Sequence, residues 1–153
     1  MQMPNNELHP QLAADCHQLG QMEISQLLLM DNALVPWFIL VPDTDKREVF
    51  ELDAEQQYLV QQEINALSGF LMARTDVEKI NLGALGNLVP QLHIHVIGRN
   101  SNDFCWPNPV WGQEQKTAWT EEAAEEISQQ LATHLKGGLV NYTPGVKLRP
   151  KSQ

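Results

Sequence analysis

The 153-residue sequence predicts a single α+β domain in which helices cover one face of an antiparallel sheet. Segments with helical and strand-like periodicity follow one another in the order helix, strands, helix, strands, helix. The connections between neighbouring strands are short, and strands joined in this way pair antiparallel. No linker or repeat divides the sequence, so we expect one domain over residues 1–153, with a core over about 20–136 and a C-terminal tail over 137–153.

The first elements are expected to be a helix and a β-hairpin. Apolar residues recur at helical spacing near the N-terminus, which predicts a helix ending at Gly20: Leu8, Leu12, Cys16 and Leu19. Two short apolar runs, residues 26–30 and 37–41, flank a turn signal at Asp31 and Asn32. These runs therefore predict adjacent strands of a hairpin, followed by a polar loop.

A long helix and two more strands are expected in the middle of the chain. Asp53 and Gln56 have the spacing of a capping box, and an apolar stripe follows at helical spacing: Val60, Ile64, Leu67 and Leu71. Residues 77–82 and 91–97 have strand-like composition and are separated by glycine-containing turn residues. A final helix is predicted over 120–136, because acidic residues begin this segment and basic residues end it before a pair of glycines.

Charge and hydropathy exclude several classes of function. Asp and Glu total 19 against 10 Lys and Arg, a formal net charge of −9, and no basic run supplies the face that a DNA- or RNA-binding protein needs. A few local donors can still hold one small phosphate ligand. The longest apolar run, residues 33–41, is too short to span a membrane, and residues 1–11 lack the features of a signal peptide. With Cys16 and Cys105 as free thiols, we expect a cytoplasmic protein with no membrane partner.

The segment over residues 86–97 carries the chemically informative side chains. Because side chains alternate along a strand, its apolar residues should face the core: Leu92, Ile94 and Val96. Gln91, His93 and His95 should then line the opposite face, with neighbours about 7 Å apart. A neutral imidazole can attack phosphorus to give a phosphoramidate intermediate. A second imidazole, when protonated, can stabilise charge on phosphate oxygens or on the leaving group.

Two other interpretations of this His-x-His pair stay open at this point. Such a pair also binds metals, and it can be a structural feature without a chemical task. A zinc site needs a third ligand, and the remaining histidines lie in predicted helix or tail regions without ligand-like spacing: His9, His17 and His134. We therefore expect no metal site, although metal binding stays as the weakest of three hypotheses.

One run of the sequence resembles the signature of the histidine triad (HIT) superfamily, in which three histidines alternate with apolar residues: Gln91-Leu92-His93-Ile94-His95-Val96-Ile97. The preceding run is similar to the family's Gly-Gln-x-Val lead-in: Gly86-Asn87-Leu88-Val89. Residues 35–42 are similar to its Pro-Gly-His-x-Leu-Val-x-Pro strand. The order of elements also fits the family over about residues 20–100.

The resemblance implies an α+β fold with a five-stranded antiparallel sheet, a homodimer, and the activity of a bacterial HIT-like nucleotide hydrolase or nucleotidyl transferase. It implies that His93 attacks the α-phosphate of a dinucleoside polyphosphate or a nucleoside phosphoramidate, through a nucleotidyl-histidine intermediate. His95 would contact the phosphate and the leaving group, Asn87 the phosphate, and Asp31 or Asn32 the ribose. No cofactor is implied, although Mg²⁺ can accompany a polyphosphate substrate.

Two positions depart from the family's pattern. Gln91 stands at the first triad position, and Phe38 stands at the position of an upstream histidine. In the family the first histidine orients the nucleophile partly through its backbone carbonyl, which Gln91 retains, so we count Gln91 with the catalytic residues. The same departures motivate an alternative from another class, a non-catalytic nucleotide-binding protein that kept the HIT pocket.

Two further features follow the His-x-His strand. Arg99 is placed to reach a substrate phosphate or, equally, to pair with surface carboxylates. Residues 106–112 contain two prolines and two tryptophans and should form an irregular but rigid loop. Its indoles can stack on a nucleobase, but a flap packed on the sheet or on a dimer partner is the favoured interpretation.

Overall fold

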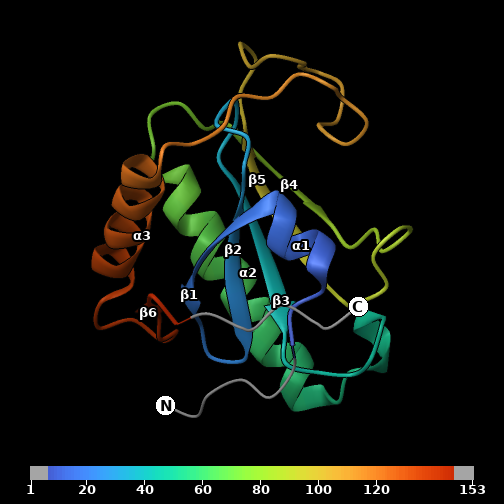
Figure 1. Ribbon diagram of the computed structural model, residues 1–153. Coiled ribbons are helices and arrows are strands. Elements are labelled where there is room, and N and C mark those ends of the chain that lie inside the picture. Colours follow the sequence, from blue (N-terminus) through green and yellow to red (C-terminus); the bar gives the residue numbers. More distant parts are fainter. Residues whose placement is uncertain (1–6, 147–153) are drawn as a thin grey trace.

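The sheet of the protein has six strands, and the helices lie on its two faces (Figure 1). The computed structural model describes residues 7–146. Spatial order across the sheet is β4-β5-β3-β2-β1-β6, and every neighbouring pair is antiparallel. The strands are β1 Cys16–Gln21, β2 Ser25–Met30, β3 Trp37–Pro42, β4 Lys79–Gly83, β5 Ile94–Arg99 and β6 Thr143–Pro144. The predicted α+β class and antiparallel pairing are confirmed, with one strand more than expected.

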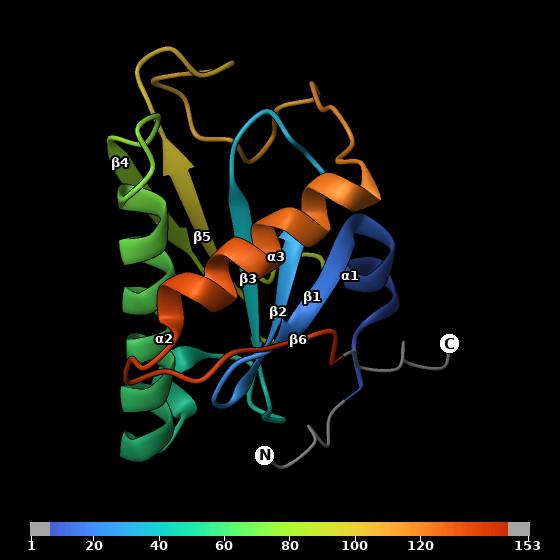
Figure 2. The ribbon, with the colours of Figure 1, turned by 90° about the vertical axis from the view of Figure 1, so that its left-hand side faces the viewer.

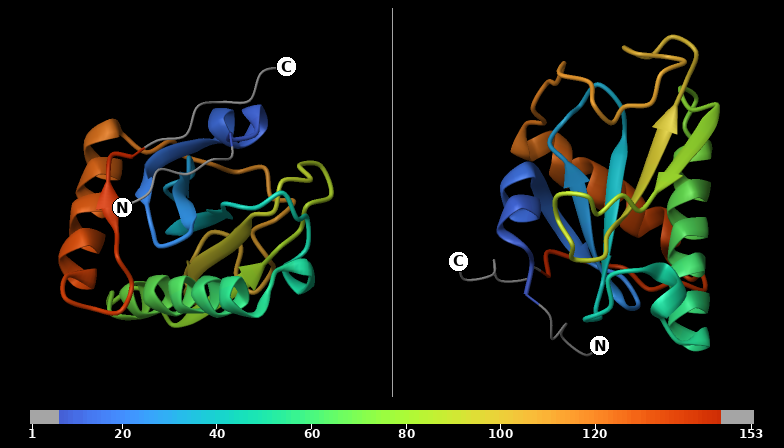
Figure 3. Two further views of the ribbon diagram at one scale, coloured as in Figure 1. Left: turned by 90° about the horizontal axis from the view of Figure 1, so that it is seen from below. Right: turned by 90° about the vertical axis from the view of Figure 1, so that its right-hand side faces the viewer.

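The two long helices, α2 (Ala54–Met72) and α3 (Glu121–Leu135), cover the same face of the sheet (Figure 2). The six-residue α1 (Pro10–Asp15) lies on the opposite face (Figure 3), and the 3-10 turn η1 (Val49–Glu51) precedes α2. Helix α2 begins where predicted, because the Asp53 carboxylate accepts from the backbone N–H of Gln56 and the Gln56 side chain accepts from Asp53 in return.

Strand alternation divides the apolar residues into two cores. The core between the sheet and the long helices contains Phe38 and Leu40 of β3. The residues that alternate with them along the strand belong to a second core on the opposite face, where α1 packs: Trp37, Ile39 and Val41. The face with the second core is the one that carries the histidines described below.

The prediction of a helix ending at Gly20 is wrong, because the observed helix α1 ends at Asp15. Leu8 and Leu12 belong to the second core, as one helical face would require, whereas Leu19 belongs to the core on the other face of the sheet. Residues from Cys16 onward instead form β1, which pairs with β2 over its length. Pairing with a neighbouring strand outweighs a helical spacing of only four apolar residues.

The remaining differences lie at element ends. The strand expected over 91–97 begins at Ile94, and the strand expected over 77–82 begins at Lys79. Part of the predicted C-terminal tail forms β6, which pairs with β1, whereas residues 147–153 lie outside the described residues. Between residues 7 and 146, no helix combines the length and hydropathy that crossing a bilayer requires.

Candidate active site

His93 and His95 lie side by side on the face of the sheet that carries the second core. Their ring centroids are 5.2 Å apart and the ring planes meet at 62°. His95 belongs to β5, and His93 lies in the extended segment immediately before it. The apolar residues that alternate with them pack in the opposite core, as the sequence predicts: Leu92, Ile94 and Val96.

The His93 ring is held through one nitrogen. Its Nδ1 lies 2.7 Å from the backbone oxygen of Gln91, and because a carbonyl only accepts, Nδ1 must be the N–H donor. A neutral His93 therefore carries its lone pair on Nε2. Nothing in residues 7–146 makes a hydrogen bond to that nitrogen. A side chain with a fixed ring and a free basic nitrogen is what a nucleophilic imidazole requires.

His95 is held from the opposite direction by an indole. Nε1 of Trp37 donates a 2.9 Å hydrogen bond to Nδ1 of His95, so Nδ1 carries a lone pair and the ring proton lies on Nε2. Burial, and secondarily the charge of a protonated His93, lowers the pKa of His95 to about 4. Trp111 meets the same ring edge-on, with centroids 5.5 Å apart. His95 is therefore a neutral hydrogen-bond donor.

Two cavities flank the histidine pair. The larger, of about 350 Å³, is lined by residues that include Asp31, Trp37, His95, Trp111 and Lys116. The smaller, of about 190 Å³, is lined by residues that include Arg47, Gly86, Pro90, Gln91 and His93. His93 and His95 are only 7% and 5% exposed, yet each borders a cavity. The larger cavity has a volume typical of small-molecule pockets.

The side chain of Gln91 points to the N-terminal segment. Its Oε1 accepts from the backbone N–H of His9, and its Nε2 donates to the backbone oxygen of Glu7, both at 2.8 Å. The carboxamide thus pairs with main chain as a neighbouring strand would. The backbone carbonyl of Gln91 contacts His93, as expected of a residue that orients the nucleophile, while its side chain holds the N-terminal segment.

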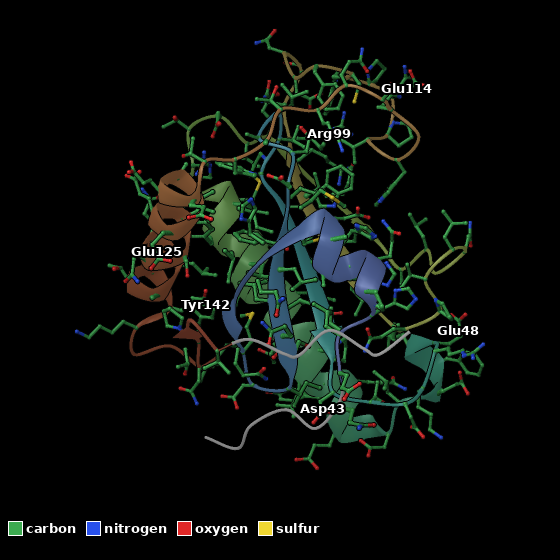
Figure 4. All side chains as sticks on the ribbon, in the orientation of Figure 1. Asp43, Glu48, Arg99, Glu114, Glu125 and Tyr142 are labelled. Carbon is green, nitrogen blue, oxygen red and sulfur yellow. The ribbon has the colours of Figure 1, made fainter. Side chains whose placement is uncertain are left out.

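Arg99 lines neither cavity, and of its two predicted roles the structure shows the ion pair with a carboxylate. Its side chain is 1% exposed and forms a bidentate ion pair with Asp103, with Nε–Oδ2 and Nη2–Oδ1 distances of 2.7 and 3.1 Å. Arg99 also donates to the Asn81 side chain and to the Asn108 carbonyl. It lies where β5 meets the loop that carries Trp111 (Figure 4), and the hydrogen bond to Asp103 raises its pKa. Arg99 therefore organises this loop.

The two polar residues after β2 have different environments. Asp31 lines the larger cavity, and its Oδ1 accepts from Nε2 of His17 and from the backbone N–H of Trp119, both at 2.9 Å. Burial alone would raise the pKa of Asp31, but these hydrogen bonds lower it. Asn32 also borders this cavity, but its amide is used within the fold, holding the segment over 115–117 and the turn at Leu34.

Asn87 lies in the turn between β4 and β5, next to Gly86, whose φ of 65° favours glycine. Its side chain is exposed and makes no hydrogen bond within residues 7–146. Gly86 borders the smaller cavity beside His93. Asn87 is therefore near the site, and its side chain is available to a ligand.

Sequence reasoning missed the indoles that surround His95. Phe38, expected at the position of the family's upstream histidine, is fully buried in the core on the other face. Its neighbour Trp37 makes the contact with His95 instead. The alternation of β3 could have identified Trp37, because Ile39 and His95 are paired and Trp37 shares the face of Ile39.

The loop over 106–112 is irregular, as predicted, and its Trp111 packs against the His95 ring. The Trp111 ring lies against Gly83 of β4, where a Cβ atom would come within 2.9 Å of it. Trp106 is partly exposed and lies over the Arg99 guanidinium, 5.7 Å from ring centroid to Cζ. Within the described residues, no three His, Cys, Asp or Glu side chains are grouped as a metal site would require.

Comparison with known proteins relates this site to a family. A family model of the HIT domain matches residues 11–102. A histidine triad protein from Bradyrhizobium japonicum is 37% identical, with a TM-score of 0.80 and coverage of 86% of this chain and 98% of that one. One from Sinorhizobium meliloti is 40% identical, with a TM-score of 0.80 and coverage of 84% and 96%. One from Marinobacter aquaeolei is 42% identical, with a TM-score of 0.79 and coverage of 88% and 98%. No curated protein matches.

Proposed function

Because the chain belongs to the HIT domain family, we propose that it is a nucleotide hydrolase or nucleotidyl transferase that acts through His93. The observation that carries this proposal is the hydrogen bond from Nδ1 of His93 to the Gln91 carbonyl. That bond leaves Nε2 as the basic nitrogen of a ring that borders a cavity. The proposed substrates are dinucleoside polyphosphates and nucleoside phosphoramidates.

The reaction has two displacements. The Nε2 lone pair of His93 forms a bond to the α-phosphorus, while the bond to the leaving group breaks and its electron pair departs with that group. Water or another acceptor then attacks phosphorus, the N–P bond breaks, and its electron pair returns to Nε2. With water, the product is a nucleoside monophosphate. Histidine supplies the nucleophile in this scheme, and Mg²⁺ is compatible with it as a companion of a polyphosphate substrate.

The larger cavity is the proposed nucleoside site. Asp31 has one carboxylate oxygen engaged by His17 and Trp119, so its other oxygen is free to accept from ribose hydroxyls. Asn87 is proposed to contact phosphate near the smaller cavity. We also propose a homodimer, which the family resemblance implies and which light scattering of the purified protein would test.

Replacement of His93 is the test of the proposed function. His93→Ala should abolish turnover across a panel of adenosine and guanosine polyphosphates and phosphoramidates, while the circular dichroism spectrum stays that of the wild type. His134→Ala removes an exposed histidine of α3 and should keep wild-type turnover. Turnover retained by His93→Ala would exclude the mechanism. Calorimetric binding of AMP by a wild type that forms no product would favour a non-catalytic nucleotide-binding protein.

A further inference from the structure

The hydrogen bond between Trp37 and His95 determines which nitrogen of His95 carries the proton. An indole N–H can only donate, so the atom it meets at 2.9 Å must have a lone pair. Both side chains are buried, and within residues 7–146 the Trp37 indole makes no other hydrogen bond. In the neutral ring Nδ1 is therefore bare and Nε2 is protonated.

Protonation of His95 would place two N–H groups against each other. It is also opposed by burial and by the neighbouring His93, whose charge adds to the cost. The ring is enclosed by aromatic groups, with centroids 5.8 Å from Trp37 and 5.5 Å from Trp111. Asp31 and Lys116 line the cavity but form no hydrogen bond with His95. The lowered pKa of His95 thus keeps its ring neutral near neutral pH.

A neutral His95 can donate a hydrogen bond from Nε2 but has no spare proton to transfer. Loss of the Nε2 proton would leave an imidazolate anion beside the still-bound indole, which is far less stable than an imidazole. The leaving group must therefore accept the electron pair of the broken bond without a proton from His95. A phosphate or carboxylate oxygen can do so, since it is stable as an anion, whereas an amine nitrogen cannot.

On the premise of the proposed function, we propose that Trp37 restricts the site to nucleotidyl anhydrides, whose leaving group departs as an oxyanion, and excludes phosphoramidates with amine leaving groups. In the favoured step His93 Nε2 bonds to the α-phosphorus, and the bridging P–O bond breaks. Its electron pair stays on the departing oxygen, which accepts a hydrogen bond from Nε2 of His95. Trp37 is a positioning residue in this scheme, because it acts on the substrate through His95.

The experiment compares kcat/KM for diadenosine triphosphate and for adenosine 5′-phosphoramidate carrying an alkylamine. The wild type should favour the anhydride by about 100-fold or more, the lower end of what a positioned general acid contributes to a reaction that needs one. Trp37→Phe frees Nδ1 for protonation and should reduce this preference at least about tenfold. Trp106→Phe, an exposed indole without a bond to either histidine, should keep the wild-type preference.

Nitrogen NMR of the histidine rings provides a readout that does not depend on turnover. In the wild type, His95 should show a bare Nδ1 and a protonated Nε2 from pH 8 to pH 5, and Trp37→Phe should show a mixture of forms. Equal turnover of both substrates by the wild type, or an imidazolium at His95 near pH 6, would overturn this inference and leave the proposed function standing. Absence of turnover for both substrates would overturn the two together.

Discussion

Replacing Asp103 with Asn should destabilise the protein more than any change to its surface ion pairs. The Asp103 carboxylate accepts five hydrogen bonds, two from Arg99 and one each from the backbone N–H groups of Asn100, Cys105 and Trp106. Asp103→Asn removes the charge and puts an NH₂ group where Oδ2 accepts from Arg99 and Asn100. Arg99 would then be a buried cation without its counter-ion.

The expected loss follows from that burial. Removing one partner of a buried ion pair costs about 3–5 kcal/mol of unfolding free energy. For a chain of this length, that corresponds to a fall in Tm of about 6–20 °C. The pKa of Asp103 is lower in the folded protein than its unfolded value of 3.8, so stability should depend on pH. The contribution of Asp103 to the unfolding free energy is present above pH 3.8 and is lost as pH falls through the pKa of the folded state.

Urea unfolding at pH 7 measures this loss, and Asp76→Asn is its matched control. Asp76 pairs with Arg74 at 3.3 Å, but its side chain is 56% exposed, so the same substitution should cost less than about 1 kcal/mol. If Asp103→Asn also cost less than about 1 kcal/mol, the buried pair would not be what holds the loop, and the reasoning would be refuted.

Three further predictions concern the buried Glu63 and the contacts of Gln91 and Gly83. Burial raises the pKa of Glu63 from 4.5 to about 7, so its contribution to stability is complete below pH 4.5 and is lost as pH rises through 7. The unfolding free energy of the wild type, measured with urea, should therefore fall between pH 5 and pH 8, and Glu63→Gln should remove up to about 3 kcal/mol of that fall. Gln91→Ala should cost about 1–2 kcal/mol and speed amide exchange at His9, and unchanged exchange would contradict the contact. Gly83→Ala should displace Trp111, visible as altered tryptophan fluorescence, because the added Cβ would lie 2.9 Å from the ring.

Local sequence signals predicted much of the fold because their causes are local. The capping box at Asp53 and the β2–β3 hairpin each depend on residues close in sequence, and both are present. The helix expected to continue to Gly20 failed because β1 is held by partners on both sides, β2 and a strand more than a hundred residues away. A two-residue strand such as β6 carries no periodicity that a sequence could display.

The histidine pair was predictable because strand alternation is a property of a single segment, although side-chain roles depend on distant partners. The sequence placed His93 and His95 on one face, but it could not show that Gln91 reaches back to residues 7–9. Nor could it show that Arg99 hydrogen-bonds to Asp103 and Asn108 of the loop after β5. The contact between Trp37 and His95 is a different case, because the alternation of β3 puts Trp37 on the face of Ile39, the residue that is paired with His95.

The order of the strands leaves the two borders of the sheet unequal. One border is β6, which has only two residues and includes Pro144, so it offers little main chain to a further strand. The other is β4, with five residues, and its Gly83 is paired with His95. A second molecule that extended the sheet at β4 would place its added strand about 10 Å from the His95 backbone. An interface formed in this way would lie on the same side of the molecule as His93 and His95.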